Sequence, residues 1–279
     1  MEQKPVFRII ESAANKKIKE IAALHKKVRR EESGLFLVEG MRLAEAAVAA
    51  KKERDAGIRL ALCTAEAAEK KRVAEILDEL GNLRIPIFET SEAIYRKASA
   101  TEHPQGILLV MEQLQNLRLE DVAGGNACLA VLDGIQDPGN AGTLLRTADA
   151  AGCTAVLALP GTVDLYNDKT VRASMGSVLH LPIVRDVARE DFAAFCEKQG
   201  IRLLAADVDE KAQPYFKADL RPPCALIFGN EGAGLSEIIS KSARKIYIPM
   251  QGRAESLNVA VSSAVLLFEA MRQRIASDA

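Results

Sequence analysis

The sequence has no tryptophan, only 4% aromatic residues, and just five cysteines and three histidines. The cysteines are scattered and odd in number, without a Cys-x-x-Cys pair, so neither a disulfide framework nor a zinc site is indicated. No apolar run reaches membrane-spanning length, and the N-terminus has no signal-peptide core. These absences favour a cytoplasmic protein that binds no metal and no membrane.

The chain is long enough for two domains, because its 279 residues are 48% hydrophobic and 27% charged. The net charge of −1 argues against a protein that coats nucleic acid. The charge is uneven, however. Residues 1–30 hold nine Lys/Arg and three Asp/Glu, which gives 9 − 3 = +6. The basic end is the N-terminus.

Hydrophobic periodicity predicts a small α/β domain over 1–112, a polar linker over 113–126 and a second α/β domain over 127–279. In the first domain Asn15 is an N-cap candidate for a helix whose apolar face includes Ile18, Ile21, Ala22 and Val28. In the second, strands alternate with helices, among them a helix over 169–179. This alternation predicts a parallel sheet with helices on both faces.

Three loops of the second domain follow buried strands. An apolar run at 225–228 ends in a glycine-rich loop at 229–236, a run at 246–249 ends in a polar loop that reaches Asn258, and a strand at 128–132 precedes the loop from Asp133. Ligands in such sheets bind beyond the carboxyl ends of the strands. We therefore expect the loops to share one site.

These three loops also resemble a known family. The sequences Leu-Asp-Gly-Ile-Gln-Asp-Pro-Gly-Asn-Ala-Gly-Thr-Leu-Leu-Arg-Thr-Ala (132–148), Ile-Phe-Gly-Asn-Glu-Gly-Ala-Gly-Leu (227–235) and Ile-Pro-Met…Ser-Leu-Asn-Val-Ala-Val-Ser (248–262) are similar, in order, to the three motifs of the SpoU (TrmH) RNA ribose 2′-O-methyltransferases. In the N-terminal domain, 15–19, 30–40 and 104–106 resemble that family's ribosomal-protein-like substrate-binding domain. The resemblance covers nearly the whole chain.

The resemblance implies a trefoil-knotted, parallel-sheet SPOUT domain that binds S-adenosylmethionine and forms a homodimer. Such knots are rare exceptions to the rules of chain topology, so strand patterns could not have predicted one. It also implies that Gly229, Ile248 and Leu257 line the cofactor site.

Glycines let the backbone approach a ligand closely, and apolar neighbours would complete a slot for an adenine and a methionine chain. The candidate cofactor-binding residues are Gly229, Gly232, Gly234, Ile248, Pro249, Met250 and Leu257. The alternative is a dinucleotide or phosphate loop. The order Gly-x-x-Gly-x-Gly does not match Gly-x-Gly-x-x-Gly, and the lysine of a P-loop is missing.

By the same resemblance, the reaction centres on Arg146, with Asn140, Glu231, Ser256 and Asn258 around it. The three histidines, His25, His103 and His180, lie outside the motifs, so the usual general base is missing. A guanidinium holds its proton too tightly to act readily as a base. We therefore expect Arg146 to hold a phosphate and to stabilise the developing alkoxide, with base catalysis as the other possibility.

Each of these residues also has an alternative role in the structure alone. Arg146 could be a helix-face arginine paired with Asp149 or Asp137. Asn258, or Ser256, could be the cap of the last helix, and Asn140 the cap of the helix that carries Arg146. Glu231 could be a turn residue near a helix N-terminus.

The candidate RNA-binding residues are the basic side chains near the N-terminus: Lys16, Lys17, Lys26, Lys27, Arg29 and Arg30. The alternative is a solvated helix surface. Aromatics are not interleaved with these charges, so structured RNA is favoured over base stacking on a single strand.

The sequence thus predicts methyl transfer from S-adenosylmethionine to a ribose 2′-hydroxyl of RNA. The added N-terminal domain favours ribosomal RNA. The same reaction on transfer RNA, or a non-catalytic RNA-binding or assembly protein of this fold, is the alternative.

Overall fold

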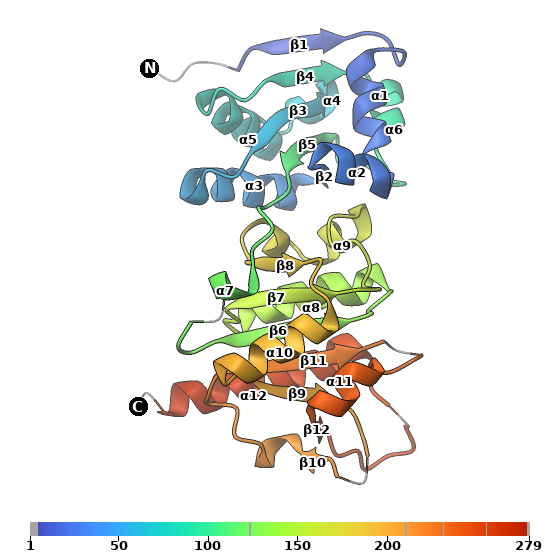
Figure 1. Ribbon diagram of the computed structural model, residues 1–279. Helices are drawn as coiled ribbons and strands as arrows, with labels where there is room; N and C mark the ends of the chain where they lie inside the picture. The colour runs from blue at the N-terminus through green and yellow to red at the C-terminus, as the bar shows by residue number, and fades with distance from the viewer. Residues whose placement is uncertain (1–4, 123, 210, 231, 255, 278–279) are drawn as a thin grey trace. The chain divides into compact units, whose positions relative to one another are not determined.

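The computed structural model describes residues 5–122, 124–209, 211–230, 232–254 and 256–277. It divides into two compact units (Figure 1). The N-terminal unit consists of residues 1–114 and 164–180, and the C-terminal unit of 115–163 and 181–279. The chain therefore leaves the C-terminal unit after its first two strands, contributes 164–180 to the N-terminal unit, and returns.

The N-terminal unit is built around a five-stranded sheet in the order β1-β4-β3-β5-β2. Strands β1, β4 and β3 are parallel, and β5 runs antiparallel to both β3 and β2. The elements are β1 (Phe7–Ile10), α1 (Lys16–Ala23), α2 (Lys27–Ser33), β2 (Leu35–Glu39), α3 (Met41–Arg54), β3 (Ile58–Thr64), α4 (Ala65–Ala68), α5 (Lys71–Asn82), β4 (Ile87–Thr90), α6 (Glu92–Ala98), β5 (Ile107–Glu112), α9 (Asp168–Ala173) and the 3-10 helix η1 (Ser177–Leu179).

Residues 164–180 belong to this unit through specific contacts. Tyr166 is fully buried and packs on Phe36 of β2 with ring centroids 4.8 Å apart. Arg30 donates from Nε and Nη2 to Asp164 Oδ2 at 2.8 and 2.7 Å. Two donors of one guanidinium thus meet the same carboxylate oxygen. This largely buried, charge-assisted contact fixes the segment on the unit.

The C-terminal unit contains a seven-stranded, wholly parallel sheet in the order β10-β12-β9-β11-β6-β7-β8. Its elements are α7 (Leu119–Val122), β6 (Cys128–Asp133), α8 (Pro138–Ala150), β7 (Ala155–Leu159), β8 (Ile183–Arg185), α10 (Arg189–Gln199), β9 (Arg202–Ala206), β10 (Gln213–Pro214), the 3-10 helix η2 (Tyr215–Lys217), β11 (Cys224–Gly229), α11 (Glu237–Ser242), β12 (Arg244–Tyr247) and α12 (Val259–Ser277).

The centre of this sheet is buried on both faces, as the continuous apolar strands predict. All six residues of β6 are buried. Leu129 and Val131 pack in one cluster with Phe192 of α10 and Ile239 of α11. Helices α8 and α12 pack together on the opposite face (Figure 1). The predicted parallel sheet with helices on both faces is confirmed. It brings the carboxyl ends of β9, β11 and β12 to one edge.

Several predicted elements differ in detail. The single N-terminal helix is two helices, α1 and α2, separated at Leu24–Lys26, so Val28 is 62% exposed rather than on the apolar face. The predicted helix over 169–179 breaks at Met175 and Gly176, which both have positive φ, into α9 and η1. Strands β1 and β10, of four and two residues, were not predicted. Asn15 is confirmed as a cap, because its side chain accepts from Lys17 N.

No helix within the described ranges is both long and apolar enough to cross a membrane. The division at 113–126 into separately folding domains stays a prediction, as does the trefoil knot. In the structure, residues 164–180 lie in the N-terminal unit rather than with the rest of 127–279.

Candidate active site

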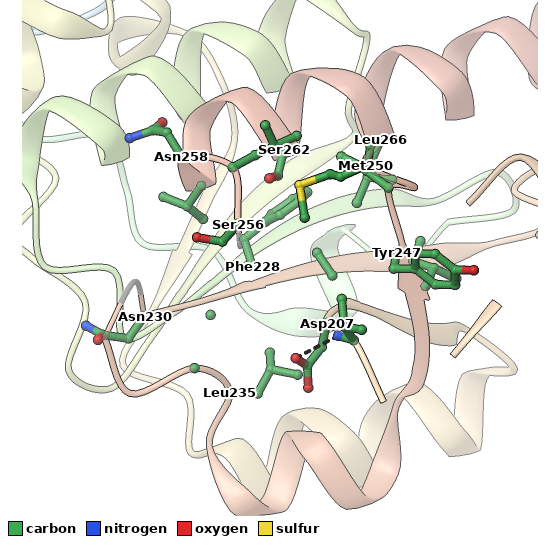
Figure 2. Close-up of a pocket in the computed structure, with 18 residues that line it drawn as sticks. Asp207, Phe228, Asn230, Leu235, Tyr247, Met250, Ser256, Asn258, Ser262 and Leu266 are labelled. Atoms are coloured by element: carbon green, nitrogen blue, oxygen red, sulfur yellow. Dashed lines mark hydrogen bonds between the residues drawn. The ribbon is translucent and has the colours of Figure 1, made fainter. Parts of the chain in front are cut away.

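A cavity of ≈ 520 Å³ lies at the carboxyl ends of β9, β11 and β12 and the start of α12. Phe228, Leu235 and Leu266 give it apolar walls, while Ser256, Asn258 and Ser262 add polar groups. Figure 2 shows Asn258 and Asn230 at one end of the cavity and Tyr247 at the other. A pocket of this size that combines apolar walls with polar groups is typical of a site for a small organic ligand.

Most of the predicted cofactor residues line this cavity. Gly229, Gly234, Ile248, Met250 and Leu257 are among its walls. Gly232 and Pro249 are not among the described residues that line it. Glycine loop and polar loop therefore do face one pocket, although not with every residue that the sequence suggested.

The glycine loop is closed by backbone contacts. Asn230 and Gly234 exchange two N–H···O bonds of 2.9 Å each, and Asn230 Oδ1 accepts from Gly232 N and Ala233 N at 2.9 and 2.8 Å. A Cβ on Gly229 would lie 2.7 Å from the carbonyl carbon of Gly234. Only glycine fits at position 229, because the atoms it would meet are backbone. Glu231, predicted to be catalytic, lies outside the described residues.

Two predicted catalytic residues meet at the start of α12. Asn258 Oδ1 accepts from Ala260 N and Val261 N at 2.9 and 3.3 Å, so it caps this helix. Its Nδ2 donates to Asn140 Oδ1 at 3.0 Å. Two residues separated by 118 positions thus form one amide pair.

The predicted cap role of Asn140 is wrong. The N-cap of α8 is Asp137, whose side chain accepts from Asn140 N at 2.8 Å, with Pro138 opening the first turn. The proline places the cap one turn earlier than the asparagine suggests. Asn140 therefore lies inside the first turn, and its side chain is directed to Asn258.

Arg146 is exposed on α8 and is not among the described residues that line the cavity. A pair of its guanidinium with Asp137 or Asp149 stays an alternative. It shares its exposed face with Thr143 and Ala150. The structure thus brings Asn140, Ser256 and Asn258 to the cavity region but leaves Arg146 on an open helix face.

Two acidic residues of the site region were missed. Asp207 lines the cavity just after β9; its Oδ1 accepts from Val208 N at 2.9 Å and its Oδ2 from Lys245 Nζ at 3.0 Å. The hydrogen bonds that Lys245 donates to Asp209 and Asp207 raise the pKa of its ammonium group. Only its position in the sequence could have identified Asp207 as a site residue, since it is the first charged residue after a buried strand.

The second missed residue, Asp133, is buried at the end of β6. Its Oδ2 accepts from the backbone N and the Oγ of Ser236 at 2.8 Å each, and its Oδ1 from Arg189 Nε at 2.7 Å. A buried carboxylate is tolerated when it is paired and hydrogen-bonded in this way. Asp133 therefore fixes the loop after β11 and the start of α10 to the central strand.

The predicted RNA-binding residues of the N-terminal unit differ in their exposure to solvent. Lys16, Lys26, Lys27 and Arg29 are exposed and Lys17 is half-buried. Arg30 is only 3% exposed because it is paired with Asp164, so the prediction that it contacts RNA is corrected. Its role is to hold the 164–180 segment.

All three histidines belong to the N-terminal unit, whereas the described residues that line the cavity belong to the C-terminal unit. No group of three or more His, Cys, Asp or Glu side chains suited to a metal occurs among the residues that the structure describes. The cavity therefore offers amides, hydroxyls, backbone groups and one described carboxylate.

The chain belongs to the SpoU rRNA methylase family, whose model matches residues 127–268. A second model, the MRM3-like substrate binding domain, matches residues 15–109. The chain is 36% identical over 260 residues to the 23S rRNA (guanosine(2553)-2′-O)-methyltransferase RlmP of Bacillus subtilis, which covers 93% of this chain and 97% of that protein.

Solved structures of rRNA and SpoU methyltransferases have a similar fold over nearly the whole chain. The AdoMet-bound rRNA methyltransferase from Sinorhizobium meliloti superposes with a TM-score of 0.83 at 30% identity, covering 95% of this chain and 98% of that one. The SpoU methyltransferase AviRb from Streptomyces viridochromogenes has a TM-score of 0.81 at 27% identity, covering 94% and 99%. The predicted family and the predicted α/β fold class are thereby confirmed.

Proposed function

We propose that this protein transfers a methyl group from S-adenosylmethionine to a ribose 2′-hydroxyl of ribosomal RNA. The observation that carries the proposal is the cavity at the strand ends, which is walled by the glycine loop and the polar loop and closed at one end by the Asn140–Asn258 pair. These are the positions of the family motifs. The names of the relatives favour a guanosine of the large-subunit RNA.

The cavity fits the cofactor. Its volume of ≈ 520 Å³ lies within the usual range of about 300–1,000 Å³ for small-molecule sites. Gly229, Gly234, Ile248 and Leu257 would hold it, because they combine apolar contacts with close backbone approach. When bound, S-adenosylmethionine supplies an activated methyl group on its sulfonium.

The residues of the chain would orient the ribose and stabilise charge. The Asn140–Asn258 pair is fixed by the cap of α12, so its amide groups are held rigidly at one end of the cavity. Ser256 presents a hydroxyl at the same end. Arg146 would bind the substrate phosphate and stabilise the negative charge that develops on the ribose oxygen as the hydroxyl proton passes to solvent water. A planar guanidinium suits this role better than that of a base.

The working form would be a homodimer. Helix α12 exposes Val261, Phe268 and Ile275, at 51%, 43% and 61%, at seven-residue intervals. A stripe with this spacing lies along one side of a helix and is typical of a seam between helices. A second chain packed there would cover the stripe and could complete the surroundings of Arg146.

The exposed Lys16, Lys26, Lys27 and Arg29, with the half-buried Lys17, would contribute to RNA binding, in the cytoplasm where ribosomal RNA is found. The test is a map of ribose methylation in the ribosomal RNA of the host with and without this gene. Loss of one 2′-O-methyl group without the gene, restored by the wild-type chain but not by Arg146→Ala, supports the proposal. An unchanged map, with loss of one methyl group in transfer RNA, would favour the transfer RNA alternative.

The non-catalytic alternative is separated by a binding measurement. A catalytic chain binds labelled S-adenosylmethionine in the cavity. The demethylated product of the cofactor should compete with the labelled cofactor for binding to the wild-type protein. Absence of any cofactor binding would favour an RNA-binding or assembly protein.

A further inference from the structure

A groove of ≈ 560 Å³ in the N-terminal unit combines an apolar floor with a basic rim. Leu35, Leu60 and Val110 form its floor, and Ile21 of α1 forms a wall together with Leu24, which caps the end of that helix. We propose that this groove binds an unpaired nucleotide of the RNA substrate, with the base on the floor and the flanking phosphates on the rim. The inference rests on the proposed function and names the part of the RNA that the N-terminal unit recognises.

The floor is a continuous piece of the sheet. Strands β3, β5 and β2 are neighbours, and Leu60 pairs with Val110 in the register of β3 and β5. Leu35 and Leu60 are only partly buried, although both pack against the core of this unit. A concave apolar surface of this kind gains free energy only from a partner that also presents an apolar face.

The rim has the opposite sign to the chain as a whole. It carries five cations and two anions, which gives 5 − 2 = +3, whereas the whole chain has a net charge of −1. The cations are Lys16, Lys17, Lys19, Arg29 and Arg59, and the anions are Glu20 and Glu32. A polyanion with apolar parts is therefore the occupant that fits by charge.

The cations differ in how freely they could bind phosphate. Lys16 pairs with Glu20 at 3.7 Å and Arg29 with Glu32 at 2.7 Å, and exposed pairs of this kind are weak enough to exchange for phosphate. Lys17 and Lys19 form no ion pair with a described residue, and Lys17 Nζ lies 5.0 Å from the ring centroid of Phe88. Lys17 and Lys19 are thus ready to bind a phosphate.

An unpaired nucleotide fits better than a duplex. The bases of a duplex are stacked and paired, so a duplex would contact the rim through its phosphates and leave the floor in water. An unpaired base in a loop or bulge exposes both of its apolar faces while its neighbours keep their phosphates. Structured RNA with a loop satisfies both parts of the groove.

The first test removes charge inside and outside the groove in the full-length protein. The variant Lys17→Gln/Lys19→Gln is compared with Lys70→Gln/Lys71→Gln, which removes the same charge from exposed residues of this unit that do not line the groove. The probe is a ribosomal RNA hairpin with 2-aminopurine in its loop, titrated at several salt concentrations. We expect the groove variant to reduce the slope of log K against log salt by about 1.4, at about 0.7 per contact on a single strand, and the control to change it less.

The second test changes the floor without changing charge. Leu60→Gln should weaken binding of the hairpin about tenfold, because a polar side chain on the floor removes the apolar surface that the base would cover, while binding of a fully paired duplex changes little. Ala23→Phe, which fills the groove from α1, should give the same pattern and serves if Leu60→Gln folds poorly. In both variants the fluorescence change of the loop 2-aminopurine should be lost.

Equal loss of hairpin and duplex binding in the floor variants, or equal salt slopes in the two charge variants, would overturn the proposal. The proposal would also fail if an acidic apolar peptide, but not the hairpin, protected Lys17 and Lys19 from acetylation, since the groove would then serve a protein partner.

Binding of labelled S-adenosylmethionine and methylation of bulk ribosomal RNA are measured in parallel. If the wild type shows neither, the proposed function fails. If it shows both, and the groove variants bind the hairpin as the wild type does, only this inference fails.

Discussion

The two units offer different kinds of binding surface. In the C-terminal unit, backbone groups, amides and hydroxyls from sequence-distant loops meet where parallel strands end. In the N-terminal unit, long cationic side chains of α1, α2 and β3 surround the open face of a mixed sheet. A site of the first kind needs particular residues at particular positions, whereas the second needs only enough charge and an apolar surface. Substitutions should therefore have larger and more position-specific effects in the C-terminal unit.

The largest effect is expected at Arg146. Arg146→Ala should lower kcat by about 10²–10³, because a donor to the developing charge is lost, and should leave the Kd for S-adenosylmethionine nearly unchanged, since Arg146 does not line the cavity. Arg146→Lys should also be largely inactive, because a point charge does not reproduce the planar fork. Single-turnover methylation and cofactor titration measure the two quantities. Full activity of the lysine variant would contradict the geometric role.

The glycine loop tests whether the cofactor site depends on backbone position. Gly229→Ala should weaken cofactor binding roughly ten- to hundredfold, because overpacking of this kind costs about 1–3 kcal/mol and the clash is with backbone of Gly234 and Leu235. Gly232→Ala is the matched control. Its Cβ would meet only Asn230 Oδ1, at 3.6 Å, and it should bind the cofactor normally. Equal loss in both variants would show that the loop tolerates no side chain for some other reason.

The parts that were predictable from the sequence depend on local patterns. Buried strands, the glycine loop and the polar loop are each marked within a few residues, and the parallel sheet with its cavity at the strand ends followed from their order. The individual catalytic roles of Asn140, Arg146, Glu231, Ser256 and Asn258 came from the resemblance and stay predictions.

What was missed depends on distant partners. Arg30 was placed on the RNA-binding surface because its partner Asp164 lies 134 residues later and in what the sequence suggested was another domain. Asp133 and Asp207 have no motif of their own; the first matters through Ser236 and Arg189, the second through its place in the cavity. Charged residues acquire their roles from tertiary contacts, which periodicity does not encode.

The apolar stripe on α12 tests whether the C-terminal unit works alone. Phe268→Glu should raise the Kd of the dimer about hundredfold or more, since a buried aromatic anchor at an interface is worth about 2–4 kcal/mol. Analytical ultracentrifugation over a range of concentrations measures it. Val28→Glu, at a residue of α2 that is 62% exposed, is the control and should not alter association. A Phe268→Glu protein that stays dimeric would place the interface elsewhere.

The smallest effect is expected at His25, whose contacts with Asp168 and Ala98, called the clasp below, help to hold 164–180 on the N-terminal unit. His25 Nδ1 lies 2.7 Å from Asp168 Oδ2, and Nε2 lies 2.9 Å from the carbonyl oxygen of Ala98. Both partners can accept, so the protonated ring, which donates from both nitrogens, satisfies both of them. The hydrogen bond to Asp168 is the largest cause that raises the pKa of His25; burial opposes it, and the nearby Glu39 adds to it.

A raised pKa in the folded state means that the clasp stabilises the protein fully below the unfolded pKa of about 6.5 and less as the pH rises through the folded value. His25→Gln should therefore lower the free energy of unfolding by about 1–2 kcal/mol at about pH 6, and by clearly less at about pH 9. Urea unfolding followed by circular dichroism at the two pH values measures this. His103→Gln, at an exposed histidine, should change neither value. An equal loss for His25→Gln at both pH values would mean that hydrogen-bond geometry, rather than the charge of His25, holds the segment in place.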